Sequence, residues 1–124
     1  MKFILILCLP VLIIAGCGNH KSKTAESGTG EINDSIPVCI RQHIEAIKKE
    51  PRWNPPAQVN EYNYNGKKVF LFSSDCCDQY NILYDDSCKT ICAPSGGLTG
   101  KGDGKCEDFF KTANFVKLIW KDPR

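Results

Sequence analysis

Residues 59–72, VNEYNYNGKKVFLF, decide the fold of this chain. Two runs rich in β-branched and aromatic residues flank Asn65-Gly66, the pair that two-residue hairpin turns prefer. The pattern predicts strands over 59–64 and 67–72. Pairing outward from the turn places Tyr64 opposite Lys67, Tyr62 opposite Val69 and Asn60 opposite Leu71 on one face, with Val59–Phe72 and Glu61–Phe70 on the other. Because both faces are partly apolar, we expect the hairpin to lie inside a larger sheet that a helix covers on one side.

An amphipathic helix is expected before the hairpin. Its apolar stripe has helical spacing and consists of Ile36, Ile40, Ile44 and Ile47. Asp34 or Ser35 can cap its start and Pro51 stops it, so the helix is expected from about Ser35 to Lys49. Trp53 is expected to anchor the following connector in the core, and His43 to lie at the boundary of the core.

Further short strands are predicted over 82–84, 89–93 and 115–120, whereas 94–105 is expected to be irregular. In the last strand, alternation places Val116, Leu118 and Trp120 on one face. The predicted class is therefore α+β: one N-terminal helix packed on a small antiparallel sheet of four to five strands, stabilised by disulfides.

The N-terminal residues predict export and lipid anchoring. A basic start and an apolar run over 1–16 end in Ala15-Gly16 before Cys17, which is typical of a lipoprotein signal peptide. An ordinary signal peptide that happens to end near a cysteine is the alternative. Residues 17–33 are rich in Gly, Ser, Thr and charge and predict a flexible tether. Residues 34–124 are expected to form a single small cysteine-rich domain.

Charge and cysteine content narrow the class further. The formal net charge is only +2 and no basic stripe occurs, so nucleic acid is not expected as a partner. Apart from Cys8 and Cys17, six cysteines remain, and an even set in an exported domain indicates a disulfide framework. They are Cys39, Cys76, Cys77, Cys88, Cys92 and Cys106. We favour pairing Cys92 with Cys106 and Cys39 with the Cys76-Cys77 loop, although spacing does not determine connectivity.

Adjacent Cys76 and Cys77 allow two interpretations. Bonded to each other, they could be a redox element, whereas each could instead pair elsewhere. We favour the second, because redox motifs usually separate two cysteines by two residues beside a helix N-terminus. Zinc ligation by these cysteines and His43 is not expected where thiols are oxidised, so no metal and no cofactor is predicted.

The glycine-rich segment 94–105 is the candidate binding loop, with Gly96, Gly97, Lys101 and Asp103 as its candidate contacts. It is not a phosphate-binding P-loop, because Gly102 follows Lys101 where Ser or Thr would be needed. A calcium site has too few carboxylates. A tight turn with glycines at positive φ, closed by a Cys92–Cys106 bridge, is the structural alternative.

Six motifs occur along the predicted domain: WNPP (53–56), EYNYNGK (61–67), CCDQYNILYD (76–85), ICAPSGG (91–97), GDGKC (102–106) and DF (108–109). Together they resemble a family of uncharacterised small lipoproteins and secreted domains found largely in Bacteroidetes, a DUF6970-like domain of unknown function. The resemblance covers roughly 36–124. It implies an exported, disulfide-bearing domain and brings no activity, ligand or catalytic residue.

This source context bears on modification and location. Asp34-Ser35-Ile36 resembles the O-glycosylation signal of exported proteins in that phylum, with Ser35 as the acceptor, and a helix cap needs the same residues. Gly18 is not the aspartate that retains many lipoproteins at the inner membrane, and no acidic run for surface export follows Cys17. We therefore expect a lipid-anchored protein of the bacterial cell envelope, at the outer membrane and facing the periplasm.

No Ser-His-Asp series, carboxylate pair or cofactor fingerprint occurs, so an enzyme is not expected. The leading hypothesis is a non-enzymatic binding or structural module that is held at the membrane by its lipid and recognises a protein or a glycan. The alternatives are a thiol-disulfide redox protein using Cys76 and Cys77, and a protease-inhibitor-like module that presents the 93–105 loop.

Overall fold

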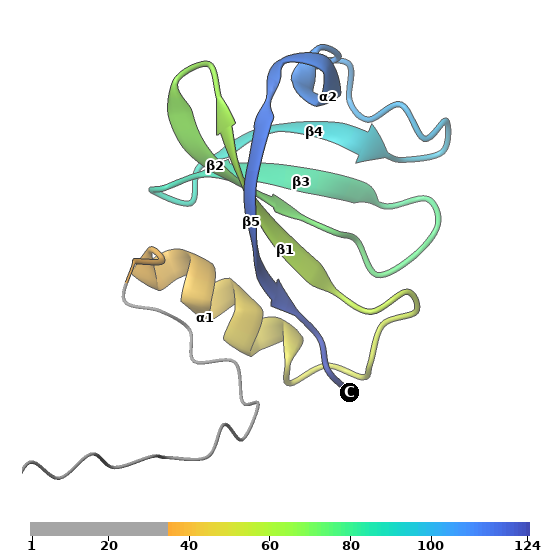
Figure 1. Ribbon diagram of the computed structural model, residues 1–124. Helices are drawn as coiled ribbons and strands as arrows, with labels where there is room; N and C mark the ends of the chain where they lie inside the picture. The colour runs from red at the N-terminus through yellow and green to blue at the C-terminus, as the bar shows by residue number, and fades with distance from the viewer. Residues whose placement is uncertain (1–34) are drawn as a thin grey trace, which may run out of the picture.

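The computed structural model describes residues 35–124. The expected signal peptide (1–16), the lipidation site Cys17 and the tether (17–33) lie outside the described residues. The elements are α1 (Val38–Ile47), β1 (Gln58–Tyr64), β2 (Lys67–Phe72), β3 (Tyr80–Asp85), β4 (Thr90–Gly96), α2 (Phe109–Thr112) and β5 (Asn114–Lys121). The five strands form one antiparallel sheet in the order β4-β3-β2-β1-β5, with α1 beside it, as Figure 1 shows. The predicted α+β class is confirmed.

The β1–β2 hairpin has the predicted turn and register. Asn65 and Gly66 both have positive φ, 51° and 73°, as the preferred two-residue turn requires. Tyr64 pairs with Lys67, and the register continues without a shift to Val59 opposite Phe72. The hairpin therefore presents two apolar faces, and each face has its own core.

The first core lies between α1 and the sheet. The helix inserts its isoleucine stripe between the hairpin and the end of β5, where the core contains Val59, Phe70, Phe72 and Trp120. Trp53 packs against this core from the connector, as predicted, and His43 lies half-buried at its boundary. Within residues 35–124, neither helix is long and apolar enough to span a membrane.

The second core lies on the opposite face, beneath α2. It contains Tyr64, Val69, Leu71, Leu83, Cys92, Cys106 and Phe109. No pattern in the sequence predicts α2. This helix has four residues, too few for a periodic pattern, and its place depends on the fully buried ring of Phe109.

The start of α1 corrects the expected cap. Pro37 is the N-cap, with extended backbone and no side-chain capping bond, so Ser35 lies two residues before the cap and is exposed. The helix also ends at Ile47 rather than Lys49. There the backbone tightens: Lys49 N–H donates to Ala46 and Glu50 N–H to Ile47.

Two expectations about strands were also wrong. β4 continues through Pro94 to Gly96, because an edge strand tolerates a proline that cannot donate to the ladder. In β5, register shifts place Leu118 opposite Asn60 but Trp120 opposite Val59, on the other face of the sheet. The predicted alternation over 115–120 therefore fails at bulges.

A disulfide between Cys39 and Cys88 joins α1 to the β3–β4 turn. The expected pairing of Cys39 with the Cys76-Cys77 loop is therefore wrong. Cys88 has positive φ, 61°, in a turn where the Asp85 carboxylate accepts hydrogen bonds from the N–H groups of Ser87 and Lys89. This turn brings Cys88 to the helix, and spacing alone could not reveal it.

Arg124 fastens the end of β5 to the end of α1. Its guanidinium donates to the carbonyl oxygens of Lys48 and Glu50 at 3.1 and 2.9 Å, and to the Asp122 carboxylate at 2.6 Å. The Asp122 side chain is buried. The hydrogen bonds from Arg124 outweigh the effect of this burial and lower the pKa of Asp122 from 3.8 to about 2.

We predict that replacing Arg124 with alanine lowers the melting temperature by several degrees, because a buried carboxylate loses its partner.

The folded-state pKa of Asp122 lies below its ordinary value, so the ionised carboxylate stabilises the fold above pH 3.8 and ceases to do so as the pH falls to about 2. Urea unfolding across this pH window measures the effect. The Asp122→Asn variant should lack this part of the pH dependence, and an unchanged slope in that variant would contradict the assignment.

Candidate functional site

The glycine-rich loop folds back onto the sheet. Gly96, Gly97 and Gly102 all have positive φ, between 72° and 79°. The amide of Gly102 donates to the carbonyl of Gly96 at 3.0 Å, and that of Asp103 donates to the carbonyl of Ala93 at 2.9 Å. A side chain at Gly102 would collide with the backbone of β4. The loop is thus a tight turn with glycines at positive φ, which was the alternative to a binding loop.

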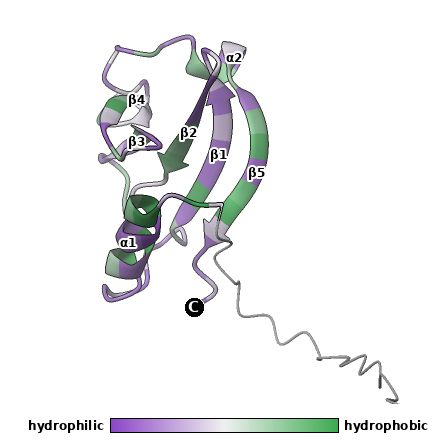
Figure 2. Ribbon diagram, turned by 90° about the vertical axis from the view of Figure 1, so that its left-hand side faces the viewer, coloured by the Kyte–Doolittle hydropathy of each residue, from purple (hydrophilic) through white to green (hydrophobic). Residues whose placement is uncertain are grey.

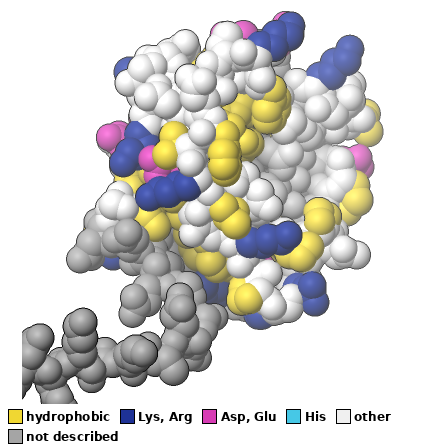
Figure 3. Space-filling view, in the orientation of Figure 1, with side chains coloured by type: hydrophobic (Ala, Val, Ile, Leu, Met, Phe, Trp, Pro, Cys, Tyr) yellow, Lys and Arg dark blue, Asp and Glu magenta, His cyan; other side chains and the backbone are white. Residues whose placement is uncertain are grey.

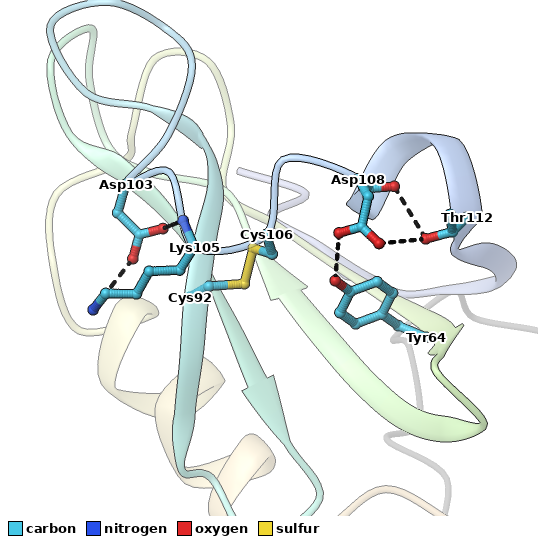
Figure 4. Close-up of a disulfide and its surroundings, with 7 residues drawn as sticks. All are labelled: Tyr64, Cys92, Asp103, Lys105, Cys106, Asp108 and Thr112. Atoms are coloured by element: carbon cyan, nitrogen blue, oxygen red, sulfur yellow. Dashed lines mark hydrogen bonds and ion pairs between the residues drawn. A yellow bond between two sulfur atoms is a disulfide. The ribbon is translucent and has the colours of Figure 1, made fainter.

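The Asp103 carboxylate is turned toward Lys105, as Figure 4 shows. Its carboxylate accepts a hydrogen bond from the backbone N–H of Lys105 at 3.1 Å, and the Lys105 ammonium lies 3.7 Å away. Desolvation acts to raise the pKa of Asp103, but the backbone hydrogen bonds, Lys105 first among them, lower it below its usual range. Asp103 therefore stabilises the loop.

The predicted Cys92–Cys106 disulfide closes the loop and is confirmed. Beyond it, the Tyr64 hydroxyl donates to the Asp108 carboxylate at 2.8 Å, and Thr112 donates to the same residue (Figure 4). The hydrogen bond from Tyr64 to Asp108 raises the pKa of Tyr64, and burial and the charge of Asp108 raise it further. The contacts fix α2 over the second core.

Cys76 and Cys77 form a disulfide with each other. The favoured interpretation, in which each pairs elsewhere, was wrong. The other four cysteines of the domain pair with one another, as Cys39–Cys88 and Cys92–Cys106. Both cysteines are exposed in the β2–β3 loop. The carbonyl of Cys76 accepts a hydrogen bond from the amide of Gln79 at 2.9 Å, which closes the loop immediately before β3.

A hollow lined mostly by aromatic and apolar side chains lies between the C-terminal half of α1, the connector and the loop end of β2 and β3. We call it the aromatic pocket. It has a volume of about 290 Å³, at the lower end of the range of small-molecule sites. Its lining consists of His43, Ala46, Ile47, Trp53, Phe72, Ser73, Ser74, Gln79, Tyr80, Ile82 and Tyr84.

The rings of the aromatic pocket support one another edge to face. His43 lies 5.1 Å from Tyr84 and 5.8 Å from Phe72, and Phe72 lies 5.3 Å from Tyr84, each measured between ring centroids. Such contacts hold the rings in fixed orientations. The indole N–H of Trp53 donates to the Glu50 carboxylate at 3.1 Å, which fixes the ring at the pocket edge.

Asn81 holds the polar side of the aromatic pocket. Its amide oxygen accepts a hydrogen bond from the N–H of Ser74 at 2.7 Å, and its amide nitrogen donates to the Ser95 hydroxyl at 2.9 Å. The Ser73 hydroxyl accepts a hydrogen bond from the backbone N–H of Gln58 at 2.8 Å. The hydroxyl and amide groups at the rim therefore stand on a fixed backbone.

The glycine loop reaches the aromatic pocket through Gly97. The amide of Gly97 donates to the carbonyl of Gln79 at 3.0 Å, and a side chain at Gly97 would collide with the ring of Tyr80. Gly97 is buried against a ring that lines the pocket. The glycine loop, which was expected to bind a ligand, thus supports the wall of the aromatic pocket, which was not predicted from the sequence.

The predicted contacts do not form one site. Gly96 and Gly97 pack on β3, Asp103 bonds its own loop, and Lys101 lies at a separate polar hollow with Pro94, Glu107 and Lys111. One signal for the pocket is present in the sequence: Tyr80, Ile82 and Tyr84 alternate, so they share a face. Its position beside α1 required the helix–sheet packing. Within residues 35–124, no group of three or more His, Cys, Asp or Glu side chains is placed to hold a metal ion.

Comparison with known proteins gives a family. The model of a domain of unknown function (DUF6970) matches residues 45–122, which include β1 to β5 and the aromatic pocket except for His43. A search of the curated proteins and a search of the solved structures found no match.

We predict that the three disulfides contribute unequally to stability. In the chain-entropy description, a bridge across 49 residues contributes about 4 kcal/mol and one across 14 about 3 kcal/mol, and a bridge between neighbours contributes least. Urea unfolding of the paired Cys→Ala variants measures the order. A Cys76→Ala/Cys77→Ala variant as unstable as Cys39→Ala/Cys88→Ala would contradict it.

Proposed function

This chain belongs to the DUF6970 family, and from that premise we propose that it is a non-enzymatic binding module of the cell envelope whose aromatic pocket binds a neutral glycan. The observation that carries the proposal is the pocket lining, which combines five aromatic rings with serine and glutamine side chains and contains no Asp, Glu, Lys or Arg. Few convergent polar groups in an apolar hollow are typical of small-molecule sites.

The lining favours a sugar over an anionic ligand. An anionic group placed here would lose water without gaining a cationic partner, which is costly. The C–H faces of a sugar ring are apolar and suit the rings of Trp53 and Tyr80, while its hydroxyls suit Ser73, Ser74 and Gln79. An apolar peptide side chain would use the rings but would leave these polar groups unused.

The lining also supports a binding rather than a catalytic role. The lining contains no carboxylate and no thiol, and its serine hydroxyls are not hydrogen-bonded to His43; that of Ser73 accepts from the backbone N–H of Gln58 instead. General acid–base or nucleophilic catalysis would need a nucleophile and a base within hydrogen-bond reach of each other. Binding needs only the fixed rings.

We predict that Tyr80→Ala weakens glycan binding about tenfold, equivalent to roughly 1.4 kcal/mol for one stacked ring. Binding can be followed by the fluorescence of Trp53 during titration with neutral oligosaccharides of glucose, galactose, mannose and N-acetylglucosamine. Phe110→Ala removes an exposed ring from α2 and should leave binding unchanged. The Trp53→Phe variant identifies the signal, since Trp120 lies in the core.

Two glycines give a matched test of how the loop supports the pocket. Gly97 and Gly100 have φ of 72° and 73°, so alanine strains the backbone equally at both positions. Only at Gly97 would the added carbon meet the Tyr80 ring, whereas Gly100 faces open space. Gly97→Ala should weaken binding and Gly100→Ala should not. Equal affinities, or the absence of any sugar that shifts the Trp53 signal, would reject the proposed pocket.

We further propose that lipid at Cys17 anchors the module to the outer membrane, facing the periplasm, with 17–33 as its tether. The support is the apolar run that ends in Ala15-Gly16-Cys17. The Cys17→Ala variant should move from the membrane fraction to the soluble envelope fraction and lack the acyl mass at its N-terminus. Unchanged fractionation without an acyl mass in the parent chain would contradict the anchor, whatever the pocket binds.

A second candidate function uses the Cys76–Cys77 disulfide, because its two sulfurs belong to neighbouring exposed residues. A partner dithiol would transfer two electrons and two protons to it and would itself become a disulfide. Insulin-reductase activity lost on Cys77→Ser would favour this redox role. The third hypothesis, a protease inhibitor, has weaker support because residues 97–105 fold back onto β4.

A further inference from the structure

We infer that an apolar stripe on β5 and α2 docks onto an anionic lipid surface. The apolar stripe consists of Phe110, Phe115, Val116 and Leu118, whose exposed fractions are 58%, 59%, 51% and 50%. Figure 2 shows β5 as a largely hydrophobic strand at the outer edge of the sheet, and in Figure 3 hydrophobic side chains follow its course. Four large apolar side chains gathered and half-exposed in this way mark an interaction surface.

The bulges of β5 create the apolar stripe. The pairing passes from Phe115, opposite Tyr62, to Lys117, opposite Glu61, and leaves Val116 without a partner on β1. Leu118, which follows this first shift and precedes the second, lies opposite Asn60, on the same face as Phe115. The face of β5 that carries Phe115 and Leu118 is the face under α2, so Phe110 adds to the same side of the domain.

The charge of this segment complements an anionic surface. From Phe109 to Lys121 the sequence contains no acidic residue, and Lys111 and Lys121 are exposed. The third lysine of this segment, Lys117, lies opposite Glu61 and its ammonium is 3.8 Å from that carboxylate, so its charge is already offset. Figure 3 shows lysine and arginine side chains beside the hydrophobic ones. Aromatic and aliphatic side chains that enter the headgroup boundary, flanked by lysines, are the pattern of surfaces that lie on membranes.

The same bulges disfavour a second strand as the occupant. β5 is an edge strand, and its outer edge would otherwise be a template for pairing. Irregular register and lysines are the features by which edge strands avoid pairing. The side chains of β5, rather than its backbone, are thus the groups available for contact, and lipid accepts apolar side chains without hydrogen bonds.

The inference goes beyond the proposed glycan site and does not depend on it. It uses the proposed anchor only as the reason why the domain stays near a bilayer. Docking by the apolar stripe would set the orientation of the domain on the membrane.

The test places a tryptophan in the stripe and measures how deeply it enters the bilayer. The full chain carrying Phe115→Trp is combined with phosphatidylglycerol vesicles that contain brominated lipid, which quenches tryptophan at the acyl boundary. The matched control is Leu98→Trp, because Leu98 is 88% exposed on the glycine loop. Quenching of the parent chain, from Trp53 and Trp120, is subtracted.

We expect loss of emission at position 115 and none at position 98. Leu118→Ser should reduce the quenching of Trp at position 115. Lys111→Gln/Lys121→Gln, or a change to phosphatidylcholine, should reduce it too, since each lysine near an anionic surface is worth about fivefold in binding. Equal quenching at both positions would overturn the inference. A blue shift at 115 in lipid-free solution that grows with protein concentration would instead assign the stripe to a second copy of the chain.

The test of the apolar stripe does not depend on the proposed lipid anchor at Cys17. If the parent chain carries no lipid, the same measurement is made by adding the chain to preformed vesicles, and the comparison between positions 115 and 98 still decides. Retained folding of each variant is checked by the unfolding midpoint in urea.

Discussion

The Asn65-Gly66 turn is the constraint on which the rest of this structure depends. It fixes the register of β1 and β2 and thereby assigns every side chain of the hairpin to one of two faces. Both faces are apolar, so each must be covered. The helix α1 covers one of them, and α2 with the closed glycine loop covers the other.

A domain of this size buries little apolar surface, so the helices that cover the two faces of the sheet need additional disulfides and hydrogen bonds to hold them in place. The Cys39–Cys88 bridge fastens α1 to the β3–β4 turn, and Cys92–Cys106 fastens the second cover to β4. Arg124 binds the last carbonyls of α1 to the end of β5. The aromatic pocket lies at the edge of the α1 cover, where the helix ends before the sheet does.

The sequence allowed prediction of the elements that local chemistry determines. The hairpin, its register, the isoleucine stripe and the loop closed by Cys92 follow from spacing within a few residues. Contacts between distant segments were missed. Nothing local to Cys39 selects Cys88, and alternation in β5 gives no sign of its bulges. The candidate site was predicted least well. The aromatic pocket joins residues of α1, the connector and β3, which are distant in sequence, whereas the glycine-rich segment was chosen for its composition alone.

The position of β5 beside β1 has a consequence for the order of folding. β1 and β2 are neighbours in sequence and can pair through a tight turn, whereas Val59 meets Trp120 only after the intervening chain has been brought round. Closing so long a loop costs entropy before its contacts contribute. The hairpin can therefore form early and the α1 core must be completed late. Until Trp120 is in place, the face of the hairpin that carries Val59, Phe70 and Phe72 stays incompletely buried.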